Sequence, residues 1–205
     1  MEDERAKFVY ETFGKGVIML TDAITAEMAK LVENSYRDVN IAFANELSII
    51  SAKLGIDVIE LIELANHHPR VNILQPGPGV GGHCIAVDPW FIVSAAPEEA
   101  RLIRMAREVN DSQPEHVIGR VVAMAARFRE PRIAALGLAF KPDIDDLRES
   151  PACRIVERLA QELPGAQIAA VEPNVTSLPP ELSGFDNVVR TDFEEGVLAA
   201  DIAVL

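Results

Sequence analysis

The sequence predicts an α plus α/β protein, with an all-helical part followed from about residue 131 by a parallel sheet. Apolar residues recur at helical spacing over residues 25–53, and no Gly or Pro interrupts them until Gly55. After Pro131, short apolar runs alternate with helical segments, which is the order of strands and crossover helices in a βαβαβ unit. Between the two parts, residues 75–90 concentrate glycine and proline around a cysteine, which predicts an irregular loop.

The helical part begins with the longest element. A helix over residues 25–53 would be about 40 Å long, which is long for a compact domain of this size. Asp57 is expected to be the N-cap of a helix over residues 58–66, because its carboxylate can accept hydrogen bonds from the first free amides. His67-His68-Pro69 should end that helix, since the residue before a proline avoids helical backbone angles.

A third helical segment follows the glycine-rich loop. Pro97-Glu98-Glu99 is typical of the first turn of a helix, and this one is expected to run to about residue 111. Pro114 lacks an amide hydrogen, so we expect it to break or kink the helix before a further helical segment over residues 115–128.

The last part of the chain carries the sheet. Its expected elements are a strand over residues 133–138, a helix over 150–163, a strand over 167–171, a helix over 192–199 and a strand from Asp201 to Leu205. This order predicts a partial Rossmann-like βαβαβ unit with three parallel strands. An apolar strand at the last residue would leave an exposed sheet edge, which stable proteins usually avoid, so we expect the chain to be a piece of a larger protein.

The composition limits the classes of partner. The 205 residues carry a formal net charge of −13, which disfavours nucleic acids and anionic membranes as partners. No apolar run is long enough for a membrane-spanning helix, and the acidic start Met1–Arg5 is not typical of a signal segment, so we expect a cytoplasmic protein. Two cysteines do not form a disulfide framework in that compartment.

The loop over residues 75–90 is the strongest candidate for an active site. Cys84 follows the glycines, and Asp88 follows Cys84 by one helical turn if the backbone turns there. A thiolate can attack an aldehyde or acyl carbon, and a nearby carboxylate can take a proton or orient water. The alternative is that Cys84 is a small buried hydrophobic residue, which is the usual state of a free cysteine.

A second candidate pair lies on the long helix. Lys30 and Asn34 are four residues apart, so they share one face, close to the apolar stripe. A partly desolvated Lys30 can polarise a carbonyl or hold an oxyanion, and Asn34 can orient a water molecule. The alternative is an ordinary solvated lysine on a polar face.

A zinc site is not expected. The available ligands are His67, His68, His83 and Cys84, and their spacing matches no structural zinc pattern. Pro69 and the loop glycines also hold the two pairs apart. We therefore expect no metal.

The segment over residues 140–150 joins the first expected strand to its helix. In doubly wound folds, ligands bind at the carboxyl ends of the strands, and anions bind at the helix N-terminus. Lys141 and Arg148 are the basic groups that could hold a phosphate there. This connection between strand and helix does not carry the pattern Gly-x-Gly-x-x-Gly, so the ordinary dinucleotide fingerprint is not present there. Cys153, in the following helix, is expected in the core.

Three motifs stand in order along the chain and cover most of its length. They are residues 25–34 (TAEMAKLVEN), residues 79–84 (GVGGHC), and Phe140-Lys141 with Arg148-Glu149-Ser150. Together they resemble the UDP-glucose/GDP-mannose dehydrogenase family. Within that family, the loop over residues 75–90 is similar to that of bacterial members that oxidise UDP-N-acetyl-D-mannosamine. Val87 stands where many UDP-glucose members have lysine, which disfavours UDP-glucose.

The resemblance implies an enzyme of polysaccharide biosynthesis that oxidises the C6 alcohol of a UDP-sugar to a carboxylate with two NAD. Cys84 would trap the intermediate aldehyde as a thiohemiacetal and would then carry a thioester. Asp88 and Asn34 would help water to hydrolyse the thioester. Lys30 would stabilise the developing oxyanion or move protons.

The resemblance also implies which residues hold the ligands. Phe140 and Lys141 would bind the nucleotide-sugar, and Gly77 and Gly81 would give it room beside the backbone. Arg148 would reach the NAD cofactor.

The same resemblance implies a homodimer through the long helix over residues 25–53, with Arg70 reaching the substrate of the neighbouring subunit. It divides the chain into a remnant of an NAD-binding domain (1–20), a central helical dimerisation domain (21–130) and a truncated UDP-sugar-binding domain (131–205). The family's NAD-binding domain, with its glycine fingerprint and catalytic glutamate, is missing from this sequence. Two alternatives therefore remain: a non-catalytic dimerising fragment, or a family member that acts on UDP-glucose or UDP-N-acetylglucosamine.

Overall fold

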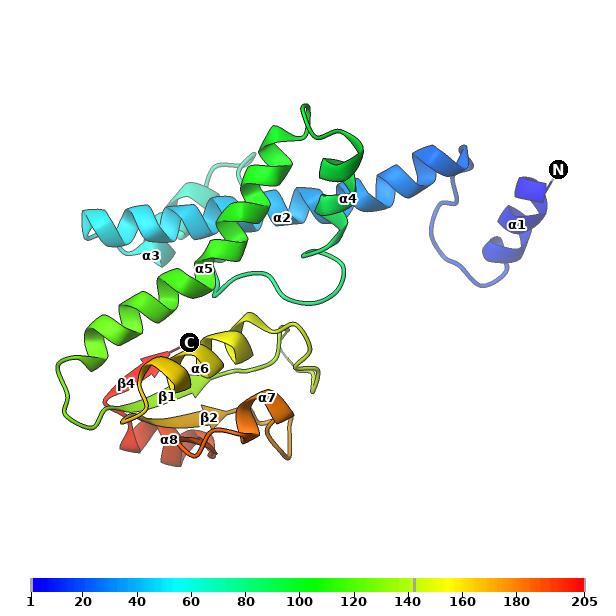
Figure 1. Ribbon diagram of the computed structural model, residues 1–205. Coiled ribbons are helices and arrows are strands. Elements are labelled where there is room, and N and C mark those ends of the chain that lie inside the picture. Colours follow the sequence, from blue (N-terminus) through cyan, green and yellow to red (C-terminus); the bar gives the residue numbers. More distant parts are fainter. Residues whose placement is uncertain (1, 142, 205) are drawn as a thin grey trace.

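The computed structural model describes residues 2–141 and 143–204 and contains a helical part beside a parallel sheet (Figure 1). The helices before the sheet are α1 (Glu2–Glu11), α2 (Ala23–Leu54), α3 (Val58–Asn66), α4 (Asp88–Ala95) and α5 (Arg101–Ala125). The sheet part consists of β1 (Arg132–Leu136), α6 (Pro151–Glu162), β2 (Gln167–Val171), α7 (Pro180–Ser183), β3 (Val188–Arg190), α8 (Phe193–Ala199) and β4 (Ile202–Val204). The predicted combination of helical and α/β parts is confirmed. Leu205, which the last predicted strand includes, lies outside the described residues.

Local sequence signals set the ends of α2 and α3. Asp22 is the N-cap of α2 and accepts a hydrogen bond from the Thr25 amide at 3.0 Å. Gly55 ends α2 with a φ of 70°, a left-handed conformation that glycine adopts without strain. Asp57 caps α3 as expected and accepts from the Ile59 amide at 2.8 Å. Although α2 is long, no helix among the described residues combines the length and apolarity needed to cross a membrane.

Of the two effects expected of Pro114, a break of the helix before the sheet does not occur. α5 is one continuous helix that contains Pro114, and it begins at Arg101 rather than at Pro97. Pro114 has no amide hydrogen to offer the Asn110 carbonyl. However, Pro114 is itself buried, and α5 packs against α2, α4 and α6. This tertiary packing offsets the lost hydrogen bond, and sequence spacing alone does not reveal it.

The sheet is parallel, with strand order β3-β2-β1-β4. In the part of the chain that the structure describes, the sheet has four strands rather than the predicted three. The strand that the sequence pattern misses is β3, an edge strand of three residues in which only Val188 is buried. α6 and the C-terminal part of α5 pack on one face and form the main core with it. α8 lies on the other face, where Gly196 approaches Val171 (Figure 1).

A buried carboxylate fixes the turn after β1. Glu172, directly after β2, is 5% exposed, and its Oε2 accepts hydrogen bonds from the amides of Leu138 at 2.9 Å and Ala139 at 3.0 Å. Its Oε1 accepts from the Asn174 amide at 3.2 Å. Burial pushes the pKa of Glu172 upward, but the hydrogen bonds from these amides outweigh burial, so the pKa lies below its usual range.

Replacing Glu172 by glutamine should lower the free energy of unfolding by about 1–3 kcal/mol at pH 7, because one acceptor oxygen becomes a donor that faces amide hydrogens. The folded pKa is lowered, so the carboxylate stabilises the fold above the ordinary glutamate value of 4.5, and this stabilisation is lost as the pH falls through the folded pKa. The difference between wild type and Glu172→Gln should therefore shrink in acid. Urea unfolding at pH 7 and at about pH 3 measures it; a difference that does not change with pH would count against the ionised carboxylate.

Candidate active site

The structure joins two predicted site residues that lie far apart in the sequence. Asn34 on α2 is completely buried, and its Nδ2 donates a hydrogen bond to Asp88 Oδ2. Asp88 is the first residue of α4, a helix that the sequence pattern does not predict and that carries Pro89 in its first turn. Because α4 packs against α2, the amide and the carboxylate meet at the contact between these helices.

Cys84 lies one turn before Asp88. Its carbonyl accepts hydrogen bonds from the amides of Val87 at 3.2 Å and Asp88 at 2.8 Å, so the backbone makes the expected turn. The Cys84 thiol is free and its residue is exposed, so the alternative of a buried hydrophobic residue does not hold. Cys153, in contrast, is half-buried against the core, and burial raises the pKa of its thiol to about 11.

Lys30 has different surroundings from Asn34, although the two share a helix. Its ammonium is exposed and lies 3.3 Å from Glu33 Oε2, so the expected partial desolvation is not found in the described residues. A long flexible side chain keeps its charge in water while its stem lies along the helix.

Arg37 orients the buried Asn34 amide. Its Nη2 donates a hydrogen bond to Asn34 Oδ1. A guanidinium only donates, so it selects the oxygen of the Asn34 amide and leaves Nδ2 to face Asp88. The carboxylate, which accepts, matches that orientation.

The loop glycines allow close packing against the segment between β1 and α6. A Cβ atom at Gly81 would lie 2.7 Å from the Glu149 carbonyl oxygen and 2.7 Å from Pro151 Cδ. Gly82 has a φ of 80°, and a Cβ atom there would lie 2.9 Å from the Phe140 ring. The space beside both glycines is therefore filled by the chain itself. This packing is a structural reason for glycine at these positions, independent of any ligand.

The basic residues of the segment after β1 are exposed. Lys141 Nζ lies 5.4 Å from the centre of the Phe140 ring, a cation–π distance. Arg148 makes a two-point ion pair with Asp146, 2.8 Å from Nε to Oδ1 and 2.7 Å from Nη2 to Oδ2. Hydrogen bonds from Arg148 hold the pKa of Asp146 far below its usual range. An incoming phosphate would therefore have to share Arg148 with Asp146.

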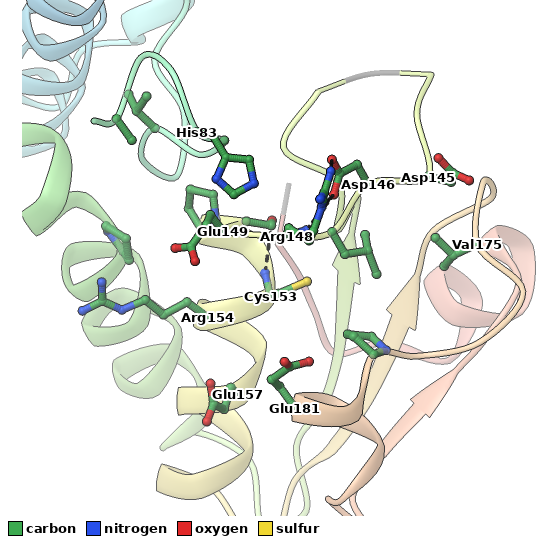
Figure 2. A pocket seen from close by; sticks show the side chains of 18 of the residues that line it. His83, Asp145, Asp146, Arg148, Glu149, Cys153, Arg154, Glu157, Val175 and Glu181 are labelled. Atoms are coloured by element: carbon green, nitrogen blue, oxygen red, sulfur yellow. Dashed lines mark hydrogen bonds and ion pairs between the residues drawn. The ribbon is translucent and has the colours of Figure 1, made fainter. Parts of the chain in front are cut away.

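A cleft of about 1390 Å³ lies between this segment and the helical part (Figure 2). Its walls come from residues 80–90, α5, the beginning of α6 and the connection after β2. Figure 2 shows the His83 ring near the Arg148–Asp146 pair, and all three residues line the cleft. The described lining residues include Arg148 but not Cys84, so the thiol lies beside the cleft rather than within it.

Two predicted binding residues lie apart from the Asn34–Asp88 contact. Arg70 is exposed after α3, and its backbone amide donates to His68 Nδ1 at 3.3 Å. Gly77 stands at the beginning of the loop, and its amide donates to Asn45 Oδ1 at 2.8 Å. The structure therefore groups the reactive candidates where α2 meets α4 and leaves Arg70 on the surface.

Sequence reasoning misses Arg37 and Glu172. Arg37 follows Asn34 by three residues, the spacing at which helical side chains meet, so this signal is present in the sequence. Glu172 directly follows a predicted strand, where parallel sheets carry functional side chains. Its partner amides come from the turn after β1, and only the folded chain brings them together.

Two regions of the chain match one protein family. Residues 24–112 match the central domain of the UDP-glucose/GDP-mannose dehydrogenase family, and residues 134–205 match the UDP binding domain of the same family. The first match includes Asn34, Cys84 and Asp88, and the second includes Phe140 and Arg148.

Proteins of similar sequence are sugar-nucleotide dehydrogenases. NDP-N-acetyl-D-galactosaminuronic acid dehydrogenase of Ralstonia nicotianae is 59% identical over 202 residues, which cover 98% of this chain and 47% of that protein. UDP-N-acetyl-D-mannosamine dehydrogenase of Escherichia coli is 57% identical over 209 residues, which cover 98% of this chain and 49% of that protein. The solved UDP-N-acetyl-mannosamine dehydrogenase of S. aureus matches with a TM-score of 0.77 and 46% identity, over 98% of this chain and 44% of that chain. The chain spans about half the length of these relatives.

Proposed function

The chain belongs to the UDP-glucose/GDP-mannose dehydrogenase family, and from this premise we propose that it forms part of an NAD-dependent UDP-N-acetyl-D-mannosamine 6-dehydrogenase. The reaction converts the C6 alcohol of the sugar to a carboxylate, a four-electron oxidation in two steps. The observation that carries the proposal is the Asn34–Asp88 hydrogen bond, which holds a carboxylate one turn from the exposed Cys84 thiol.

Cys84 is the nucleophile in this proposal. Its thiolate adds to the C6 carbonyl of the aldehyde that the first oxidation forms, and the product is a thiohemiacetal. Loss of a hydride from C6 and of the hydroxyl proton leaves a thioester. Water then adds to the thioester carbonyl, and the C–S bond breaks to release the acid and the thiol. Asp88 takes the proton of that water.

Asn34 and Lys30 support these steps from α2. Asn34 Nδ2 binds Asp88 Oδ2, which leaves Oδ1 to contact the water. Lys30 lies one turn from Asn34. Its exposed ammonium can leave the ion pair with Glu33 and pair instead with a developing oxyanion.

The described residues do not themselves build a dinucleotide site. The turn after β1 lacks the glycine pattern, and the amides of Leu138 and Ala139 already bind Glu172. NAD supplies the acceptor for both hydrides in this proposal, and it is held mainly by residues outside this chain. Arg148, on the wall of the cleft, is the contact that this chain contributes.

The sugar and the nucleotide rest on separate arguments. The 57% identity to the Escherichia coli enzyme supports UDP-N-acetyl-D-mannosamine as the substrate. Phe140 and Lys141 present an exposed ammonium beside an aromatic ring, a pair suited to a nucleotide and its phosphates. The 59% identity to the Ralstonia enzyme favours a second candidate, the same oxidation of an NDP-N-acetyl-D-galactosamine. Initial rates of the intact protein with UDP-N-acetyl-D-mannosamine, its galacto and gluco epimers and UDP-glucose decide between them.

The purified chain should bind UDP but form no NADH from UDP-N-acetyl-D-mannosamine and NAD. Calorimetric titration measures the first, and absorbance at the NADH band measures the second. Lys141→Ala should weaken UDP binding about ten-fold, because a charge-assisted phosphate contact is lost. Lys53→Ala, an exposed lysine at the end of α2, is the matched control. Undetectable UDP binding would refute the binding role, and NADH formation would refute the division of the cofactor site.

We further propose that α2 forms a homodimer with a second copy of the chain. Five of its exposed apolar side chains, Met28, Val32, Tyr36, Phe43 and Ile50, fall within roughly 80° of the helix circumference. Such a stripe on one face is typical of a helix that packs against a partner.

Phe43→Glu should convert the dimer to a monomer, because it places a charge in the centre of the apolar stripe. Light scattering after size exclusion measures the molecular mass. Glu27→Lys, an exposed change elsewhere on α2, should leave the dimer intact. A dimer that survives Phe43→Glu would place the interface elsewhere.

A further inference from the structure

α2 carries a buried polar stripe on the side that faces α5 and α4. Asn34, Asp38 and Asn45 are each 0% exposed, and they recur at intervals of four and seven residues along the same side. α5 contributes the equally buried Arg107 and Asn110. Polar groups at this depth need partners, and here the partners form a chain of hydrogen bonds that ends on the catalytic loop.

The chain begins at an ion pair. Arg107 Nη1 lies 2.5 Å from Asp38 Oδ1, and Asn110 Nδ2 donates to the same oxygen at 2.8 Å. Asn45 Nδ2 donates to Asn110 Oδ1 at 2.9 Å. The amide of Gly77 then donates to Asn45 Oδ1 at 2.8 Å.

The direction of each bond follows from the donors and acceptors available. Arg107 only donates, so Asp38 Oδ1 accepts, and Asn110 must therefore face it with its Nδ2. The Oδ1 of Asn110 then remains as the acceptor for Asn45, so Asn45 must donate from its Nδ2. Asn45 is left with its Oδ1, which points to the Gly77 amide. The ion pair thus fixes both side-chain amides in the one orientation that offers an acceptor to the loop.

We propose that Asn45 is a positioning residue for the Cys84 loop, held in its acceptor orientation through Asn110 by the buried Arg107–Asp38 pair. Asn45 secures the beginning of the loop at Gly77, and Asn34 secures its end at Asp88. One face of α2 therefore holds both ends of the segment that presents the thiol. The catalytic meaning of this arrangement rests on the proposed role of Cys84, but the arrangement itself is testable without any sugar nucleotide.

The direct test is hydrogen exchange of the Gly77 amide together with the alkylation rate of Cys84 by iodoacetamide. Asn45→Leu should speed Gly77 exchange about ten-fold, the effect of one lost hydrogen bond, while the central amides of α2 stay protected. It should also change the Cys84 alkylation rate at least about three-fold, because the loop moves relative to α4. Peptide mapping reports Cys84 and the half-buried Cys153 separately, so Cys153 serves as the internal reference.

Gln113→Leu is the matched control. Gln113 is a buried amide on the same helix pair and donates to Ser48 Oγ at 3.4 Å, outside the chain that reaches Gly77. Gln113→Leu should leave Gly77 exchange and Cys84 alkylation unchanged, because Gln113 makes no contact in the chain of hydrogen bonds described above. Equal effects of the two variants would overturn the proposal, since they would show a general loss of packing.

Amide exchange in the wild type and activity of the intact protein provide two further tests. In the wild type, the Gly77 amide should exchange about ten-fold more slowly than that of Gly79, for which the described residues provide no hydrogen-bond partner. Equal rates would overturn the proposal even if Asn45→Leu fails to fold. In the intact protein, Asn45→Leu should lower kcat and leave KM unchanged. A wild-type protein that shows no activity but normal protection of the Gly77 amide would refute the proposed function. The positioning role of Asn45 would still hold in that case.

Discussion

Cys84→Ser in the intact protein should reduce formation of the uronic acid by roughly a thousand-fold or more, the largest effect expected from any single substitution in this chain. Serine keeps the size and hydrogen-bonding capacity of the side chain but removes the thiolate that adds to the aldehyde. Quantifying the acid and NADH formed from UDP-N-acetyl-D-mannosamine measures the loss. Because Cys84 is exposed and does not belong to the core clusters of the described residues, the melting temperature should stay within a few degrees of that of the wild type.

UDP binding separates a chemical defect from a structural one. Cys84→Ser should bind UDP as the wild type does, since Phe140 and Lys141 lie on a different segment. Full activity of Cys84→Ser would remove the thiol from the mechanism. Loss of UDP binding together with activity would instead indicate a disturbed loop.

Asp38→Ala should lower the free energy of unfolding by about 3–5 kcal/mol, because it leaves the buried Arg107 without its counterion. Arg107 also pairs with Asp111, but the Asp111 side chain is half exposed. It therefore does not replace the fully buried carboxylate of Asp38. Burial raises the pKa of Asp38 more than Arg107 lowers it, so the pair is maintained against a considerable desolvation cost. Urea unfolding at pH 7 measures the loss.

Two controls make this prediction specific. Arg158→Ala removes a surface ion pair with Glu115 and should cost less than about 1 kcal/mol. The double variant Asp38→Leu/Arg107→Met replaces both charges by apolar groups and should recover a large part of the lost stability. A cost for Asp38→Ala no larger than that of Arg158→Ala would show that the pair is not effectively buried.

Most of the element boundaries follow from local signals. Asp22, Asp57 and Ser150 each cap the helix that the sequence pattern predicts, and each accepts a hydrogen bond from an amide in the first turn. Such contacts lie within three residues, so they can be inferred without the fold. The errors are at α4, at the start of α5, at Pro114 and at β3. Packing against distant elements contributes at Pro114 and at β3.

The candidate site likewise has some features that the sequence predicts and others that depend on packing. Residue type and motif order select Asn34, Cys84 and Asp88, and the structure places these three next to one another. Lys30 is selected by the same reasoning, yet its charge is in water. The motifs identify residues by their chemical type. Whether such a residue is buried depends on which helices cover it, and the motifs do not show this.

The sequence by itself indicated the family, through the resemblance of its three motifs. It also determined the order of a helical part and a parallel sheet and the loop in which Cys84 lies, because these depend on local spacing, caps and glycine content. Only the tertiary structure decided that the glycines of this loop pack against Phe140 and Pro151, and that Glu172 fills the turn after β1. It also decided that a line of oriented amides leads from Arg107 to Gly77. The physical reason is that each of these features needs a donor and an acceptor, or two backbones, from elements far apart in the chain.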